Sequence, residues 1–367
     1  MRKSYPRCLP LSLIILYLLL FVAACKKDKT APQPPPITNY AKLGLYELIS
    51  TTNRRVFIPI TKIGTVSINY ASIFDTGSTG MTIDATNILP ASMITSSGII
   101  VPGDSVVYNG ITVTSQQSTI SYGGAGGSIT TEYGNLAYAP VTIGDANGNI
   151  TTGRIPIFLY YKAQDVTNNK TLIAHSNDVF GVGPGTSFAS SAIGSPLSYF
   201  TLPTSVTSGF RLGMFQTASF TTGGTYVPGL LVIGLTPDDL NSSGFIMHNL
   251  NYYSQGGYSP NIPATINYNG TDVSALLLFD TGNPSVTFVE NEAASANTLT
   301  LPANTIVSLT TSSGFTYQYT TTSNYNLTQV LRPSYSGDPR SIFSIDFFLS
   351  NEYLMDYQNH RIGLKNN

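Results

Sequence analysis

The chain contains two similar segments, IFDTGSTGMTI at residues 73–83 and LFDTGNPSVTF at residues 278–288. In each copy an apolar, strand-like run ends in Phe, Asp-Thr-Gly follows, and alternating apolar residues come next. An Ile-Pro pair precedes both copies: Pro59 lies 16 residues before Asp75, and Pro263 lies 17 residues before Asp280. This agreement in order, spacing and pattern predicts two related lobes that present the same turn, because chance hairpin turns would not share it.

Two carboxylates held within hydrogen-bonding distance cannot both ionise cheaply, so they share one proton. One is then a base and the other an acid, and together they can activate a water for attack on a peptide carbonyl. We therefore predict Asp75 and Asp280 as the catalytic pair. The other motif residues would brace the turns and let them approach each other; these predicted support residues are Thr76, Gly77, Ser78, Thr281, Gly282 and Asn283.

Composition agrees with such a protein. The 367 residues are 42% hydrophobic and only 10% charged, with a net charge of −1, which argues against a disordered chain or a nucleic-acid-binding protein. The 33 glycines, 22 prolines and 23 tyrosines favour many short strands and tight turns. The length predicts two lobes, each with its own core.

The N-terminus has the pattern of a bacterial export signal. Basic residues precede an apolar run over residues 11–22, and Val22-Ala23-Ala24-Cys25 resembles the site at which lipoprotein signal peptidase cuts. We predict a signal peptide over residues 1–24, lipidation of Cys25, and a Pro-rich tether over residues 25–41. The alternative is an uncleaved anchor helix. The sequence thus predicts an exported, lipid-anchored protein, on the outer membrane of a Gram-negative bacterium since Lys26 follows the lipidated cysteine.

Processing would leave the mature body without a free cysteine. Cys8 would leave with the signal peptide and Cys25 would carry the lipid, so no disulfide, metal–thiolate site or thiol nucleophile is expected. The three histidines are isolated in the sequence, so we predict no metal and no cofactor.

At this point the chain resembles the pepsin-like aspartic proteases. Beyond the two Asp-Thr-Gly motifs, Tyr122-Gly123 and the glycine-rich stretch after them are similar to the flap hairpin that closes over substrate. The run Val179-Phe180-Gly181 is similar to the strand that supports the first aspartate, residues 229–234 to the strand that opens the second lobe, and residues 346–364 to the closing strands. The resemblance spans about residues 42–367.

Four departures from the family pattern stand out. Asn283 replaces the usual Thr or Ser, Thr82 stands in place of a tryptophan, and Ser344-Ile345 precede Asp346 where a Gly is usual. The flap hairpin is also long, which keeps Tyr133 as a second candidate for the flap tyrosine.

The resemblance implies an all-β, bilobal fold with a cleft between an N-terminal lobe (42–222) and a C-terminal lobe (223–367). It implies an aspartic endopeptidase that acts on a peptide or protein substrate. We expect a monomer that contacts the membrane only through its lipid and binds no nucleic acid. The alternative is a catalytically inactive surface protein of the same fold that binds peptides or acts as an inhibitor.

Overall fold

The computed structural model describes residues 38–124, 127–254 and 256–367. The predicted signal peptide, Cys25 and most of the predicted tether lie outside the described residues. Strands dominate the described part, and the all-β prediction is confirmed. The helices are short: α2 (Pro237–Asn241), α3 (Pro333–Ser336), and the 3₁₀ turns η1 (Ala91–Met93), η2 (Pro196–Tyr199), η3 (Thr217–Ser219) and η4 (Ile345–Leu349). No helix among these residues has the length and apolar character needed to cross a membrane.

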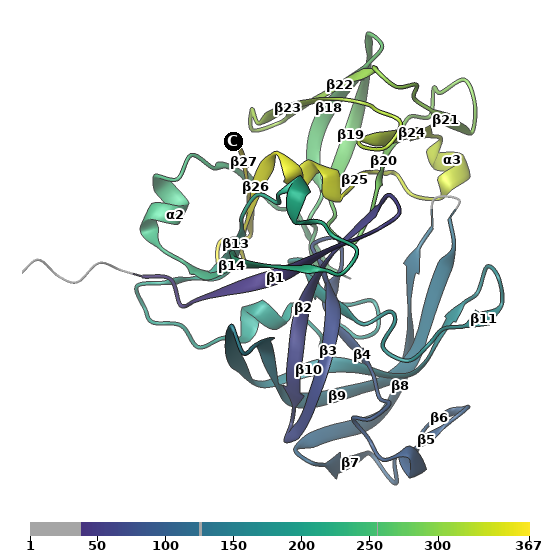
Figure 1. Ribbon diagram of the computed structural model, residues 1–367, viewed down its shortest axis with the longest axis vertical. Coiled ribbons are helices and arrows are strands. Elements are labelled where there is room, and N and C mark those ends of the chain that lie inside the picture. Colours follow the sequence, from purple (N-terminus) through teal and green to yellow (C-terminus); the bar gives the residue numbers. More distant parts are fainter. Residues whose placement is uncertain (1–37, 125–126, 255) are drawn as a thin grey trace, which may run out of the picture. The chain divides into compact units, whose positions relative to one another are not determined.

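A large, mixed sheet is formed by strands from both halves of the chain (Figure 1). Its order within the described residues is β15 (Ile246–Asn249), β27 (Arg361–Asn366), β26 (Asn351–Asp356), β13 (Thr207–Leu212), β14 (Thr225–Leu235), β1 (Ala41–Ser50), β2 (Asn53–Ile63), β3 (Val66–Asp75), β12 (Val179–Val182), β4 (Thr79–Asp84), β10 (Gly148–Asp165), β9 (Ile129–Asp145), β8 (Ile111–Gly123) and β7 (Ser105–Tyr108), with β11 (Lys170–Thr171) beside β10. Residues 229–234 lie in β14, which pairs with β1. Strands from both sides of the predicted lobe boundary therefore share this sheet, and the boundary itself stays a prediction.

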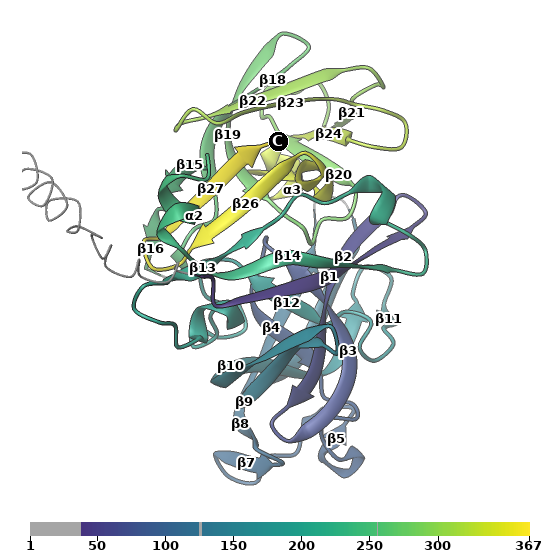
Figure 2. The same cartoon turned by 60° about the vertical axis from the view of Figure 1, so that its left-hand side comes forward.

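A second sheet belongs to the later part of the chain. Its order is β21 (Thr298–Thr300), β24 (Leu327–Leu331), β20 (Val286–Glu290), β25 (Arg340–Phe343), β19 (Thr271–Phe279), β18 (Ile262–Tyr268), β22 (Ile306–Thr311) and β23 (Thr316–Thr320). Two small hairpins, β5–β6 (Ile94–Thr95, Gly98–Ile99) and β16–β17 (Tyr252–Tyr253, Gly257–Tyr258), complete the fold. Figure 2 shows this sheet at one end, β7–β10 at the other, and β1, β14 and β26 between them.

Local sequence explains the hairpins. Strands β18 and β19 are joined at Asn269-Gly270, and both residues have positive φ, at 50° and 76°. An Asn-Gly pair in this conformation forms the two-residue turn whose twist matches antiparallel strands. The same pair, Asn109-Gly110, joins β7 and β8.

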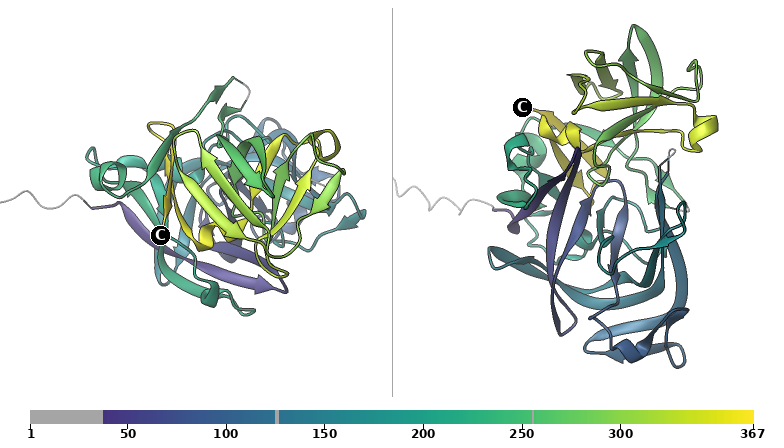
Figure 3. Two further views of the ribbon diagram at one scale, coloured as in Figure 1. Left: turned by 90° about the horizontal axis from the view of Figure 1, so that it is seen from above. Right: turned by 45° about the vertical axis from the view of Figure 1, so that its right-hand side comes forward.

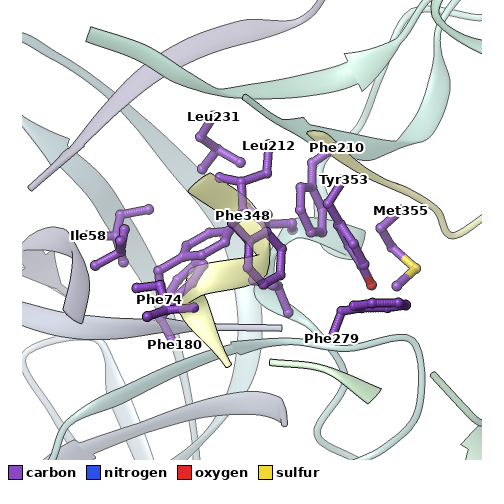
Figure 4. Close-up of a cluster of buried hydrophobic side chains, with 14 of the residues drawn as sticks. Ile58, Phe74, Phe180, Phe210, Leu212, Leu231, Phe279, Phe348, Tyr353 and Met355 are labelled. Atoms are coloured by element: carbon purple, nitrogen blue, oxygen red, sulfur yellow. The ribbon is translucent and has the colours of Figure 1, made fainter. Parts of the chain in front are cut away.

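A cluster of buried hydrophobic side chains includes Phe74 and Phe279, each of which directly precedes a motif aspartate in the sequence (Figure 4). Phe74 stacks on Phe180 at a ring separation of 6.3 Å, and Phe279 lies 4.1 Å from Phe347. All four rings are buried, so the strand ends that carry the motif aspartates rest on packed side chains.

The start of the predicted closing strands is a turn instead. Residues 345–349 form the 3₁₀ turn η4, whereas β26 and β27 follow as expected. Four consecutive residues, 345–348, are buried. A strand sends successive side chains to opposite faces, and here the turn sends Phe347 towards Phe279 and Phe348 towards Phe215.

Candidate active site

The first motif is the turn between β3 and β4. Asp75 is the last residue of β3, and the short strand β12 runs parallel to β3 with Phe180 opposite Phe74 and Gly181 opposite Asp75. A Cβ at position 181 would lie 2.7 Å from the Ser78 hydroxyl oxygen, so only glycine leaves that hydroxyl its place. The Val179-Phe180-Gly181 strand thus supports Asp75 as the sequence predicted.

The second motif repeats this arrangement. Asp280 directly follows β19, and β25 runs parallel to β19 with Phe343 opposite Phe279. The Asp280 amide donates to the Phe343 carbonyl at 2.9 Å. Two supporting strands more than 150 residues apart in the chain therefore hold the two aspartates in the same way.

The two turns are bound to each other through their threonines. Each backbone amide, of Thr76 and of Thr281, donates to the hydroxyl of the other threonine at 3.0 Å. Each hydroxyl in turn donates across the junction, from Thr76 to the Phe279 carbonyl at 2.7 Å and from Thr281 to the Phe74 carbonyl at 2.6 Å. Both threonines are buried, so these bonds are shielded from water.

The motif glycines allow each turn to approach the opposite carboxyl group. A Cβ on Gly77 would lie 2.4 Å from Cγ of Asp280, and one on Gly282 would lie 2.7 Å from Cγ of Asp75. No side chain fits at these distances. The structure thus brings the two predicted aspartates together over a pair of turns that only glycine can form.

The two carboxyl groups have different surroundings. Asp75 accepts hydrogen bonds from the Gly77 amide at 2.7 Å, the Ser78 amide at 3.2 Å and the Ser78 hydroxyl at 2.5 Å. Asp280 accepts one from the Gly282 amide at 2.7 Å. Burial, then the charge of Asp75 and a hydrogen bond to it, raise the pKa of Asp280 well above its ordinary value. The two carboxyl groups therefore share a proton as a coupled pair, in which protonation of Asp280 is favoured.

Comparisons with known proteins place this geometry in a known fold. No protein-family model and no curated protein matches the sequence. Among solved structures, an aspartic proteinase from Irpex lacteus matches 89% of this chain and 98% of its own, with 17% sequence identity and a TM-score of 0.53. The chain has the bilobal fold of an aspartic proteinase. At this identity the likeness is one of fold.

Two departures from the family pattern compensate for each other. The register of β25 places Ser344 where β12 has Gly181. The Asn283 amide group donates to the Val286 carbonyl at 2.8 Å, whereas the Ser78 hydroxyl of the first turn donates to Asp75. Ser344 is buried beside this turn, and its amide donates to the Thr287 hydroxyl at 3.3 Å. Asn283, a predicted support residue, thus donates to the backbone of its own turn and not to the Asp280 carboxyl group.

The predicted flap is the hairpin of β8 and β9, whose long blue strands are seen in the right-hand view of Figure 3. In this hairpin Tyr122 pairs with Thr130, and Gly123 pairs with Ile129. The Tyr122 hydroxyl lies 3.5 Å from the Thr82 hydroxyl. Burial and the charges of Glu132 and Asp75 raise its pKa well above the ordinary value. Thr82, which occupies the position where pepsin-like proteases usually have a tryptophan, thus contacts Tyr122.

Tyr133, the second flap candidate, lies on another side of the hairpin. It pairs with Thr119, and the Lys162 ammonium lies 4.1 Å from the centre of its ring. Tyr122 is the candidate that reaches β4, the strand directly after the first motif, through its contact with Thr82.

Three charged residues near the site were not predicted. Arg55 donates to the Gly282 carbonyl, and Arg54 forms a buried ion pair with Asp346 at 2.5 Å. Glu132 is fully buried on β9, where it pairs with Ile120 of β8. An Arg-Arg pair within a strand of a chain with 10% charged residues is the signal that could have drawn attention to the first two. Within the described residues no three His, Cys, Asp or Glu side chains gather as they would around a metal ion.

Proposed function

We propose that this protein is an aspartic endopeptidase that hydrolyses peptide bonds with a water activated by Asp75 and Asp280. The observation that carries the proposal is the pair of cross-bonded turns that brings the Asp75 and Asp280 carboxyl groups together. Two carboxyl groups held this close share one proton. Shared protonation of this kind supplies a base and an acid at one place, without a nucleophilic side chain or a metal.

The proposed reaction proceeds in two steps. The water oxygen bonds to the peptide carbonyl carbon while Asp75 takes a water proton and Asp280 gives its proton to the carbonyl oxygen. The tetrahedral intermediate then collapses: the C–N bond breaks, the leaving nitrogen takes the proton held by Asp75, and a hydroxyl proton returns to Asp280. The Thr76–Thr281 bonds keep both carboxyl groups in position throughout.

The proposed substrate is an extended segment of a peptide or protein, covered by the β8–β9 hairpin and Tyr122. A strand-like peptide can satisfy its backbone groups against such a hairpin, as in other strand-addition complexes. The low overall charge supports a partner that is not a nucleic acid.

The test is cleavage of a mixed peptide library between about pH 3 and 7. Asp75→Asn and Asp280→Asn should each abolish cleavage, and a statine-type inhibitor should block the wild-type protein. A matched control is Asp104→Asn, since Asp104 is exposed and far from the motif in sequence. Cleavage that survives both motif substitutions would exclude this mechanism.

A second candidate is a silent peptide-binding or inhibitor protein of the same fold. The observation in its favour is that Asn283 leaves Asp280 without the hydroxyl bond that Ser78 gives Asp75. Tight peptide binding without any cleavage, in the same library experiment, would favour this candidate.

We also propose that the protein is exported and anchored by a lipid on Cys25, and that it acts as a monomer. The sequence pattern at residues 22–25 supports this proposal. Fatty-acid labelling of the expressed chain should be lost in Cys25→Ser and kept in the matched control Cys8→Ser. Equal labelling of the wild type and Cys25→Ser would refute it.

A further inference from the structure

Arg55 is a charged residue beside the aspartate pair that the motif does not include. Arg54 and Arg55 are neighbours on β2, so their side chains leave opposite faces of the strand. Arg54 is buried, paired with Asp346 and 4.5 Å from the ring centre of Tyr325. Arg55 is half-buried on the other face, where it meets the second motif turn.

Arg55 is attached to that turn directly. Its Nη1 donates to the carbonyl of Gly282, the glycine that faces Asp75. None of the ion pairs formed by the described residues involves Arg55. Burial lowers the pKa of Arg55, and the charges of Asp280 and then Asp75 act in the opposite direction. The guanidinium keeps its charge at any pH a protein experiences, so the aspartate pair always has a cation beside it.

We propose that Arg55 is a positioning residue of the aspartate pair, whose charge keeps the pair singly ionised in acid and whose bond to Gly282 fixes that charge at the second turn. The inference rests on the proposed function, because it assigns a role within the same site. It also explains why an arginine is half-buried here without an ion-pair partner among the described residues: its counter-charge is the single negative charge of the pair.

Other charged or titratable groups face the pair from the surrounding elements. The charge of Asp280 contributes to raising the pKa of Arg340, at the start of β25, but Arg340 already forms an ion pair with Asp338 at 2.6 Å. Burial raises the pKa of the Tyr122 phenol on β8, and the charges of Glu132 and Asp75 raise it further. Burial also raises the pKa of the Glu132 carboxyl group. These two groups are neutral in acid, so they do not replace the charge of Arg55 there.

The sign of the effect follows from the charge states. Fully protonated, the aspartate pair is neutral and contains no base; with one proton lost, it has a charge of −1 and contains the base that takes the water proton. A nearby cation stabilises the second state. Removal of the cation should therefore move the acid limb of activity to higher pH.

The experiment compares pH profiles of kcat/KM, from about pH 2 to 7, for wild type, Arg55→Gln, Arg55→Met, Arg55→Lys and the control Arg154→Gln. Arg154 is exposed on β10, over the ring of Tyr138. An adjacent charge moves a carboxyl pKa by about 1–3 units, and solvent at a half-buried site reduces this. We expect the limb of Arg55→Gln and Arg55→Met to rise by about 0.5–1 pH unit, a loss of about three- to tenfold below the limb. Arg55→Lys should restore most of it, and Arg154→Gln should change nothing.

A readout independent of activity separates this inference from the proposed function. The carboxyl ¹³C signals of the aspartates, followed by NMR from about pH 2 to 7, should show the pair titrating at higher pH in the two neutral variants. Cleavage that depends on both aspartates, with an unmoved limb and an unmoved titration, overturns the role of Arg55 and leaves the proposed function intact. A moved titration in a protein without cleavage supports the role of Arg55 and refutes the proposed function. A uniform loss of kcat/KM at every pH would show a merely structural role and would also overturn the inference.

Discussion

Glu132→Gln should make this protein much less sensitive to rising pH. Glu132 lies on β9, fully buried, with one carboxyl oxygen bonded to the Asn177 amide at 3.0 Å. The other oxygen has no hydrogen-bond partner among the described residues. Burial is the main cause that raises the pKa of Glu132 from its ordinary value of 4.5 to about 8, and the charges of Asp178 and Asp84 add to it.

The magnitude follows from that rise. A folded-state pKa above the unfolded value means that the folded protein binds the extra proton, so stability is complete below about pH 4.5 and falls as the pH rises towards 8. Each pKa unit corresponds to about 1.4 kcal/mol, which gives a loss of about 5 kcal/mol over the whole interval. A glutamine has no proton to lose, so the stability of the variant should not show this decline. The buried amide, with imperfect hydrogen bonds, should cost the variant about 1 kcal/mol of stability at every pH.

The assay is urea unfolding followed by far-UV circular dichroism, because the chain has no tryptophan. Free energies of unfolding, measured at intervals from pH 4 to 9, should leave Glu132→Gln about 1 kcal/mol less stable than wild type in acid. The order should reverse as the pH rises, with Glu132→Gln the more stable protein at pH 8. Glu47 has a pKa raised to about 7 by burial and acts in the same direction, but it is common to both proteins and cancels. The exposed Asp104→Asn should follow the wild-type curve. Parallel curves for wild type and Glu132→Gln would refute the reasoning.

Three further substitutions test how the two halves of the site are held. Thr281→Val deletes the hydroxyl that joins the two turns and leaves the buried Thr76 amide and Phe74 carbonyl without this partner. Thermal unfolding should show a loss of about 2–5 kcal/mol, which Thr281→Ser should largely avoid. Equal stability of the Val and Ser variants would contradict this prediction. Arg54→Met leaves the buried Asp346 carboxylate without its ion-pair partner and should lower the free energy of unfolding in urea by about 3–5 kcal/mol. Adding Asp346→Asn should restore part of this loss. If the losses of the two single variants simply add in the double variant, the ion pair contributes nothing. Asn283→Ser should destabilise the protein while Ser344 is present and should be tolerated when Ser344→Gly is added. A double-mutant cycle on the free energy of unfolding should therefore give a coupling of about 1 kcal/mol. Zero coupling would show that the two positions are independent.

The sequence predicted the part of the site that is local and repeated. Asp75 and Asp280 could be paired because each follows an apolar strand at matched spacing, and the structure brings them together. The strand that supports Asp75 was predicted from its resemblance to the family's supporting strand, and the structure gives a steric reason for Gly181, since a Cβ there would meet the Ser78 hydroxyl. The motif turns themselves are predictable because their pattern lies within a few residues of each aspartate.

The features that were missed depend on partners far apart in the chain. Arg54 reaches Asp346 across 292 positions, and nothing in the local pattern of β2 indicates that one arginine enters the core while the next faces the second turn. The 3₁₀ turn at residues 345–349 was missed for a similar reason. A run of apolar residues after Asp346 fits a strand equally well until the positions of Phe279 and Phe215 are known.

Asn283 and Ser344 show why departures from a family pattern cannot be weighed one at a time. Taken singly, each removes a feature that the first lobe has: the hydroxyl at Ser78, or the glycine at Gly181. Taken together they are one change, because the glycine is needed only where a hydroxyl-bearing side chain occupies the space that its Cβ would enter. The second lobe has neither, and its aspartate keeps two hydrogen bonds: its carboxyl group accepts from the Gly282 amide, and its backbone amide donates to the Phe343 carbonyl. The difference that remains is electrostatic. Asp280 lacks the hydroxyl donor that Asp75 has, so no such bond offsets the burial and the charge of Asp75 that raise the pKa of Asp280, and under our proposal the cation at Arg55 supplies the stabilisation of the ionised pair.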